Sequence, residues 1–308
     1  MRGLLVVNPK ATTTNDVTRD VLISALADKF HLEVVTTTHR GHAGELGARA
    51  REEAMDCILT LGGDGTVHEV VNGLLAEGAQ PSLPVLGTVP GGSANVFARA
   101  LGFPQDAVES TGLLLRAMRD GHTRTIGLGQ VEDRYFTFTA GLGLDAEIME
   151  RMEQARAKGK SATPTRYLAT TVRHFFTGSD RKQPALLLHR EGEEPIDGVF
   201  LAIVQNTSPW TYIGAHPVNP SPRASFDTGL DLWATKTMRT AQAVRLSTRI
   251  VFSRQRGNPK SMVAWHDLDE FRITAVRPTP MQVDGELVGD VTDVTFRSAR
   301  SALRVYVP

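Results

Sequence analysis

Short apolar runs alternate with stretches of helical periodicity over the first third of the chain. Runs of strand length lie at residues 4–7, 32–38, 57–61 and 85–89. Apolar residues with helical spacing follow these runs, at residues 16–29 and 44–53 and in the segments that begin near Val67 and Val96. Because strands that alternate with helices form mostly parallel sheets covered by helices, the pattern predicts an α/β domain over residues 1–122.

The pattern changes after about residue 122 to short apolar runs without regular helices between them. Such runs lie at residues 135–139, 185–188, 199–204, 230–233 and 271–274. Glycine, proline and aspartate residues separate most of these runs, which is typical of antiparallel strands joined by turns. Two segments of helical spacing interrupt the series near residues 147–176 and 238–253. We therefore expect a β-rich sandwich domain over residues 123–296.

The composition is that of a soluble globular protein. The length of 308 residues suggests two domains, and 41% hydrophobic with 22% charged residues leaves room for a sizeable core. Lysine plus arginine and aspartate plus glutamate both number 34, and this zero net charge argues against a nucleic-acid partner, which needs a basic surplus. The one cysteine allows no internal disulfide. With no signal peptide and no apolar run of membrane-spanning length, we expect a cytoplasmic protein whose membrane contact is peripheral.

Three loops at the predicted strand ends have the chemistry of phosphate-binding loops. They are residues 8–12 (NPKAT), 62–66 (GGDGT) and 90–95 (PGGSAN). Glycines let the backbone approach a ligand closely, and the free N–H groups at the start of a helix favour anions. Loops at the carboxyl ends of neighbouring parallel strands converge on one crevice. A single glycine turn is better explained as a plain connection, whereas three such loops at one sheet edge favour a ligand site.

Asp64 is the unusual member of these loops, because a carboxylate beside phosphates repels them unless a cation intervenes. The combination of Asp64 with the glycine loops therefore indicates a metal–nucleotide complex rather than bare phosphate. No group of histidines and cysteines has the spacing of a zinc site.

The motifs NPKAT, LGGDGTVHEVVNGL and VPGGSANVFARALG, in this order and spacing, resemble the diacylglycerol kinase catalytic-domain family. The chain is similar to its soluble bacterial lipid kinases, which are related to sphingosine kinases and, more distantly, to NAD kinases. The resemblance continues through AGLGLDA (140–146), FDTGLD (226–231) and QVDGE (282–286), and so covers nearly the whole chain. It implies a Rossmann-like α/β nucleotide domain and a C-terminal β-sandwich domain, with the last strand, about residues 297–308, returning to the first domain.

The resemblance assigns the three loops to ATP. The ATP contacts that it implies are Asn8, Pro9, Lys10, Thr38, Gly62, Gly63, Asp64, Gly65, Thr66, Ser93 and Asn95. Asp64 would also help to hold the catalytic magnesium. Of Asp284 and Glu286, one would accept the proton of the lipid hydroxyl and the other would coordinate metal or orient the first. The sequence leaves open which residue has which role, and outside the family context the segment is an ordinary β-turn.

Two further features concern metal binding. The resemblance places a structural magnesium at Asp227 and Asp231, and a simple Asp-Gly turn explains this segment equally well. Two acids that many relatives carry near the catalytic metal are replaced here by Val96 and Gly127. These replacements leave the ATP loops intact and bear on magnesium coordination, on the level of activity and on the identity of the substrate.

The function implied by the resemblance is an ATP- and magnesium-dependent lipid kinase that converts diacylglycerol to phosphatidic acid. The alternatives are a kinase for another lipid or polyol alcohol, and a nucleotide- or lipid-binding regulator without catalysis. The expected partner is a lipid substrate at a membrane surface. The basic stretches 151–177 and 239–260 suit an anionic leaflet, and solvated basic faces explain them equally well. The sequence is compatible with an oligomer and leaves the oligomeric state open.

Overall fold

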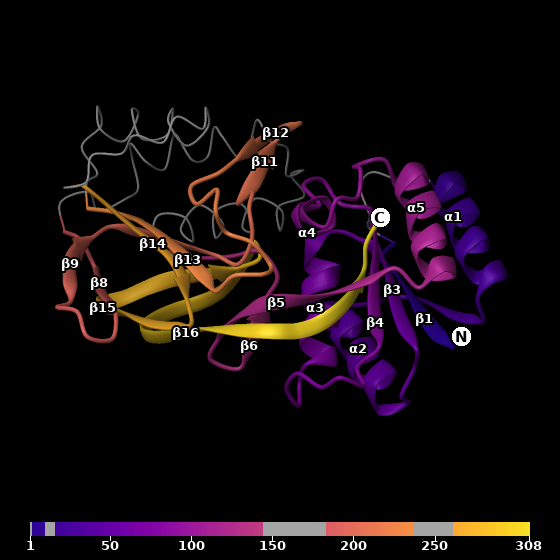
Figure 1. Cartoon of the computed structure of the whole chain (residues 1–308), viewed down its shortest axis with the longest axis horizontal. Helices are drawn as coiled ribbons and strands as arrows, with labels where there is room; N and C mark the ends of the chain where they lie inside the picture. Colours follow the sequence, from indigo (N-terminus) through magenta and orange to yellow (C-terminus); the bar gives the residue numbers. More distant parts are fainter. Residues whose placement is uncertain (1, 10–15, 144–182, 237–260) are drawn as a thin grey trace. The chain divides into compact units, whose positions relative to one another are not determined.

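A computed structural model describes residues 2–9, 16–143, 183–236 and 261–308 (Figure 1). The chain divides into two compact units, Met1–Leu128 with Ala299–Pro308 (unit 1) and Gly129–Ser298 (unit 2). The divisions after residues 128 and 298 fall inside strands β5 (Thr123–Val131) and β16 (Glu286–Tyr306). The sequence-based boundary at residue 122 marks instead the point where the last helix of unit 1 ends, because that is where the residue pattern changes.

Unit 1 contains a parallel sheet whose strands are β1 (Gly3–Val7), β2 (Leu32–Thr36), β3 (Cys57–Gly62) and β4 (Val85–Pro90). Their order is β2-β1-β3-β4, and the end of β16 adds a further parallel strand through the pairing of Val305 with Leu86. Strands β1, β3 and β4 are buried along their whole length, as expected of a parallel sheet covered on both faces. The α/β prediction for this part of the chain is confirmed.

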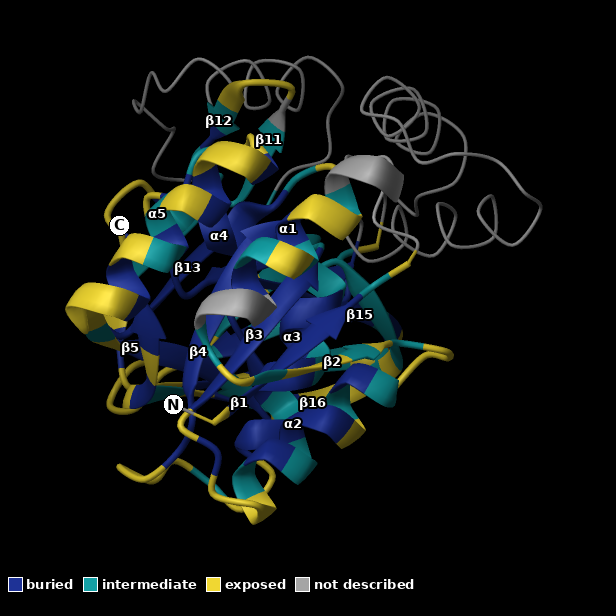
Figure 2. Ribbon diagram, turned by 90° about the vertical axis from the view of Figure 1, so that its right-hand side faces the viewer, coloured by how far each residue is buried: buried dark blue, intermediate teal, exposed yellow. Residues whose placement is uncertain are grey.

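Five helices of unit 1 cover this sheet. They are α1 (Asp16–Lys29), α2 (His42–Glu52), α3 (Asp64–Leu74), α4 (Val96–Ala100) and α5 (Ala107–Asp120). Helices α1 and α2 lie on opposite faces of the sheet (Figure 2), and α3 packs against α2. Helices α2 and α3 approach closely at glycines, since a Cβ on Gly73 would lie 2.0 Å from the carbonyl oxygen of Gly44.

Unit 2 is an antiparallel structure, as predicted. Its main strand order is β14-β13-β10-β7-β15-β16, and the strands not yet given bounds are β7 (Thr139–Gly143), β10 (Leu201–Gln205), β13 (Leu230–Thr235), β14 (Met262–Leu268) and β15 (Glu270–Val283). Shorter strands pair at its margins: β6 (Arg134–Phe136) with β5, and β8 (Leu186–His189) with β9 (Ile196–Val199). A separate hairpin joins β11 (Thr211–Ile213) to β12 (His216–Val218).

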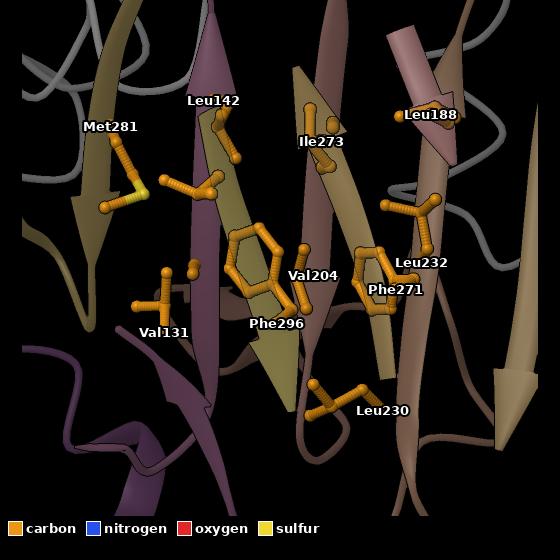
Figure 3. Close-up of a cluster of buried hydrophobic side chains, with 14 of the residues drawn as sticks. Val131, Leu142, Leu188, Val204, Leu230, Leu232, Phe271, Ile273, Met281 and Phe296 are labelled. Atoms are coloured by element: carbon orange, nitrogen blue, oxygen red, sulfur yellow. The ribbon is translucent and has the colours of Figure 1, made fainter. Parts of the chain in front are cut away.

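Apolar side chains from these strands form the core of unit 2 (Figure 3). Phe296 stacks on Phe271 with ring centroids 5.2 Å apart and meets the edge of Phe136 at 6.3 Å. The predicted helical segments and both basic stretches lie outside the described residues. Within the described part of the chain, no helix is long and apolar enough to cross a membrane.

Candidate functional site

The GGDGT and PGGSAN loops of unit 1 lie directly against each other at the carboxyl ends of β3 and β4. The Gly91 N–H donates to the carbonyl oxygen of Gly62 at 2.7 Å. A Cβ added to Gly92 would lie 2.7 Å from the Cα of Gly63, a distance that real side chains do not reach. The two backbones are therefore in contact, and this contact requires glycine independently of any ligand.

Asn95 fixes the shape of the PGGSAN loop. Its backbone is left-handed, with φ of 49°, a conformation that asparagine tolerates better than most residues. Its side-chain amide closes a ring on Gly92, accepting from that N–H at 2.8 Å and donating to that carbonyl oxygen at 2.6 Å. The residue is 2% exposed. Asn95 thus shapes the loop, while Ser93, the other predicted ATP contact in it, is exposed.

Asp64 joins the two loops. One carboxylate oxygen accepts the N–H of Val96 and the other accepts the N–H of Phe97, each at 3.0 Å. These are the first two residues of α4, whose N–H groups have no partner inside the helix. Asp64 therefore caps a helix that begins 32 residues later in the chain, a role that its motif did not reveal.

The NPKAT loop comes to the same edge of the sheet. The Asn8 amide donates to the hydroxyl oxygen of Thr66 at 3.0 Å, and the Asn8 N–H donates to the carbonyl oxygen of Leu61 at 3.0 Å. Pro9 is exposed, and Lys10 lies outside the described residues. Asn8 and Thr66, which the sequence analysis assigned to one ligand, are thus in contact with each other.

Thr38 lies in the loop after β2, next to two histidines. The Thr38 N–H donates to Nδ1 of His42 at 3.1 Å, which fixes that ring nitrogen as an acceptor. The rings of His39 and His42 stack with centroids 5.0 Å apart. Glu69 of α3 accepts the N–H groups of Gly41 and Ala43 at 2.9 and 3.2 Å, and so caps α2. No local sequence signal could have shown Glu69 in this role, because its partners lie 26 and 28 residues away.

The described residues around Asp64 fit magnesium only together with substrate phosphates. Magnesium in kinases binds to one or two carboxylates, to waters and to phosphate oxygens, so a single protein carboxylate is a sufficient contribution. Among the described residues, no group of three histidine, cysteine or acidic side chains is arranged to hold a metal by itself.

Asp284 of unit 2 lies in a tight turn between β15 and β16. Val283 pairs with Glu286, so Asp284 and Gly285 form a two-residue hairpin loop, with φ of 48° and 82°. Positive φ at both residues is the requirement of the type I′ turn, for which Asp-Gly is a favoured pair. The plain-turn interpretation of this segment therefore describes its backbone correctly.

The Asp284 carboxylate, however, points into the protein and is 4% exposed. Its Oδ2 accepts the N–H and the hydroxyl of Thr137 at 2.7 and 2.9 Å, and its Oδ1 accepts the N–H groups of Phe138 and Thr139 at 3.0 and 3.1 Å. These bonds explain why the predicted single strand over residues 135–139 is divided into β6 and β7. The chain bends at Thr137 and Phe138 so that three successive N–H groups face one carboxylate.

Glu286 differs from Asp284 although the two flank one glycine. It is the first residue of β16 and is half-buried. Asp284 has its lone-pair directions taken up by four donors, which suits a residue that holds the turn. The structure thus separates two carboxylates that the sequence left interchangeable.

Asp227 and Asp231, the predicted ligands of a structural magnesium, have different surroundings in the described structure. Asp227 is exposed, whereas Asp231 is 2% exposed and accepts from Nδ1 of His266 at 2.6 Å and from the N–H of Asp267 at 3.1 Å, both on Oδ1. Burial raises the pKa of Asp231, an effect that these two hydrogen bonds oppose. A register shift between Leu230 and Leu232 places His266 and Asp267 opposite Asp231. The structural magnesium at these two residues stays a prediction.

The first part of the chain is similar in sequence to known proteins. Residues 2–131 match the family model described as diacylglycerol kinase catalytic domain. The chain is 35% identical over 144 residues to a diacylglycerol kinase of Staphylococcus epidermidis, a match that covers 46% of this chain and 43% of that protein. It is also 35% identical over 152 residues to a diacylglycerol kinase of Bacillus subtilis, covering 48% and 47% of the two chains. These matches thus span less than half the length of the relatives.

Solved structures extend the likeness in fold. The crystal structure of a diacylglycerol kinase from Bacillus anthracis superposes with a TM-score of 0.72 at 20% identity, covering 100% of this chain and 97% of that one. An NAD kinase from Archaeoglobus fulgidus, solved in complex with ATP, superposes with a TM-score of 0.53 at 13% identity, covering 99% and 93%. The chain therefore has the fold of these kinases, and its residues 2–131 match the model of the diacylglycerol kinase catalytic domain.

Proposed function

We propose that this protein is an ATP- and magnesium-dependent kinase that transfers the γ-phosphate of ATP to a lipid hydroxyl, with diacylglycerol as the acceptor and phosphatidic acid as the product. The observation that carries the proposal is the pair of glycine loops that Asp64 holds together within the segment that matches the kinase family. Contact between two glycine backbones at the ends of parallel strands is a suitable base for a nucleotide, because no side chain there blocks the approach of phosphates.

The nucleotide would lie over the loops of unit 1. Thr66 and Val67 donate their N–H groups to the carbonyl oxygen of Gly63, so the first N–H groups of α3, those of Asp64 and Gly65, are the ones directed at a phosphate. The bonded pair of Asn8 and Thr66, together with Thr38 and Ser93, would supply further polar contacts. When bound, magnesium would neutralise charge on the phosphate oxygens, with Asp64 as the protein ligand.

Glu286 is the proposed base for the acceptor hydroxyl. A base must lie within hydrogen-bond reach of the proton that it accepts. Asp284 receives four hydrogen bonds and is 4% exposed, which suits a residue that fixes the turn. Glu286 is half-buried at the start of β16 and is the better candidate of the two.

The acceptor would be taken from a membrane surface. The basic stretches 151–177 and 239–260 of the sequence support contact with an anionic leaflet, and such contact would bring the protein to its lipid without a membrane-spanning segment. We propose a cytoplasmic protein that associates transiently with the membrane in this way.

The test is transfer of labelled γ-phosphate from ATP to a panel of acceptors in mixed micelles that contain anionic lipid. The panel consists of diacylglycerol, a sphingoid base, a glycolipid and glycerol, each with magnesium or with a chelator. We expect magnesium-dependent labelling of diacylglycerol above the other three acceptors. Stronger labelling of another acceptor would retain the kinase and change its substrate, and no labelling of any acceptor would contradict the proposal.

A second candidate, a nucleotide- or lipid-binding regulator without catalysis, is favoured by one observation. Residues Val96 and Gly127 replace acids of many relatives, and no described group of three acidic, histidine or cysteine side chains is arranged to hold a metal. A regulator of this kind would bind ATP with the same affinity with and without magnesium and would label no acceptor. Calorimetric titration with ATP beside the transfer assay distinguishes the two candidates.

A further inference from the structure

We infer that Thr137 is a positioning residue for the proposed phosphate transfer, holding Asp284 so that the turn presents Glu286 in one direction. The inference rests on the proposed function and adds to it a residue that belongs to none of the predicted motifs. Thr137 lies 147 residues before Asp284 in the chain, in the bend between β6 and β7.

Thr137 makes two of the four hydrogen bonds to the Asp284 carboxylate. Both converge on Oδ2, from the backbone N–H at 2.7 Å and from the hydroxyl at 2.9 Å. Oδ1 accepts the main-chain N–H groups of Phe138 and Thr139. The Thr137 hydroxyl is therefore the one side-chain donor among the four, and a substitution can remove it without altering the main chain.

The bend that carries Thr137 is anchored from its other side. The Asn206 amide donates to the carbonyl oxygen of Thr137 at 2.9 Å, and the Asn206 N–H donates to the carbonyl oxygen of Phe138 at 3.0 Å. Asn206 and Thr137 are both 0% exposed. Thr137 thus lies between a residue at the end of β10 and the turn after β15, and little freedom of movement remains to it.

Backbone hydrogen bonds of Asp284 and Gly285 also fix the turn. The Asp284 N–H donates to the carbonyl oxygen of Thr139 at 2.8 Å, so the backbone and the side chain of Asp284 are both tied to the same bend. Gly285 follows with a positive φ, and its N–H donates to the side-chain oxygen of Gln282 at 2.8 Å. Glu286 is attached directly to this fixed pair, so the direction of its carboxylate depends on how firmly Asp284 is held.

The consequence is specific to the catalytic step. Loss of the Thr137 hydroxyl removes one donor to Oδ2, which loosens the turn while the ATP loops of the other unit keep their own contacts. A small misplacement of a base can lower a rate by about 100-fold, so we expect a fall of about 10- to 100-fold in kcat with little change in the KM for ATP.

The experiment compares Thr137→Val, which has nearly the same shape without the hydroxyl, with Thr137→Ser, which keeps it. Thr137→Ala repeats the loss with a side chain too small to clash. The matched control is Thr235→Val, since Thr235 is a buried threonine of unit 2 whose hydroxyl bonds at 3.3 Å to the carbonyl oxygen of Ser261 and not to the turn. Each variant is assayed for phosphate transfer to diacylglycerol and for its thermal midpoint.

We expect a reduced kcat for Thr137→Val and Thr137→Ala, recovery to near the wild-type value in Thr137→Ser, and a wild-type kcat for Thr235→Val. An unchanged kcat in Thr137→Val, or an equal fall in Thr235→Val, would overturn the inference while the proposed function stays supported by wild-type transfer. Absence of transfer by the wild-type protein would overturn the proposed function and this inference together.

Discussion

Asp64 is the residue whose structural role differs most from what its motif suggests. GGDGT predicts a metal-side carboxylate, and the structure adds that the same carboxylate caps α4 through the N–H groups of Val96 and Phe97. Loss of a helix-capping side chain costs about 1 kcal/mol of stability. Asp64→Ala should lower the free energy of unfolding by about this amount and should also weaken ATP binding measured in a chelator, because one of the links between the loops is lost.

Asp106→Ala is the control for this prediction. Asp106 caps α5 by accepting the Glu109 N–H at 2.8 Å and lies outside the glycine loops. It should cost a similar free energy of unfolding and leave ATP binding unchanged. Equal weakening of metal-free ATP binding by both variants would show that Asp64 acts only through general stability.

Asp231 leads to a prediction about pH. Burial raises its pKa, so the folded state penalises the ionised carboxylate. The protonated Asp231 side chain stabilises the folded state. This contribution is complete below the ordinary aspartate pKa of about 4 and is lost as the pH rises through the raised pKa of the folded protein. Asp231→Asn keeps an acceptor for His266 and Asp267 without a charge, and should therefore unfold at a higher urea concentration than the wild type at pH 7, with a smaller difference at pH 4.

Asp231→Ala and Asp227→Asn complete this experiment. Asp231→Ala leaves the two donors without their acceptor and should cost about 1–3 kcal/mol. Asp227→Asn changes an exposed side chain and should have no effect on unfolding. A thermal midpoint that magnesium raises in the wild type and not in Asp231→Asn would support the predicted metal site.

At the scale of elements, the GGDGT and PGGSAN loops depend on each other because their backbones are in contact. Gly92→Ala places a Cβ 2.7 Å from the Cα of Gly63, so the loops must separate, and ATP affinity should fall at least 10-fold in a calorimetric titration. Gly112→Ala is the matched control, because Gly112 lies in α5 with no atom within 4 Å of the added Cβ. It should stabilise the protein by about 0.5–1 kcal/mol and keep wild-type ATP affinity, and a comparable loss of affinity in both variants would contradict the loop-contact account.

The sequence predicted elements better than it predicted contacts between them. Apolar runs gave the strands of unit 1, and GGDGT with PGGSAN gave the two strand ends that meet. What the sequence could not give depends on long-range pairing. The bend at Thr137 forms because a carboxylate 147 residues later needs donors, and the partners of Asp231 depend on a register shift that no local pattern encodes.

At the scale of the whole molecule, the comparisons with known proteins support the two units differently: unit 1 by sequence and fold, and unit 2 by fold. The family match ends at residue 131, close to the division at residue 128, so it covers the described glycine loops of unit 1. Unit 2 has the fold likeness and its own core, and it carries the residues on which the choice of acceptor and the proposed base depend. The nucleotide part of the proposal is therefore better supported than the acceptor part.

The most direct test of the central claim is the rate of phosphate transfer to diacylglycerol by Glu286→Gln. The variant removes a proton acceptor and keeps the shape of the side chain, and general-base catalysis contributes about 100- to 10,000-fold to a rate. Asp290→Asn, an exposed acid on the same strand, serves as the control. We predict a fall of at least 100-fold in kcat for Glu286→Gln with unchanged ATP affinity and a wild-type rate for Asp290→Asn. Wild-type turnover by Glu286→Gln would contradict the account.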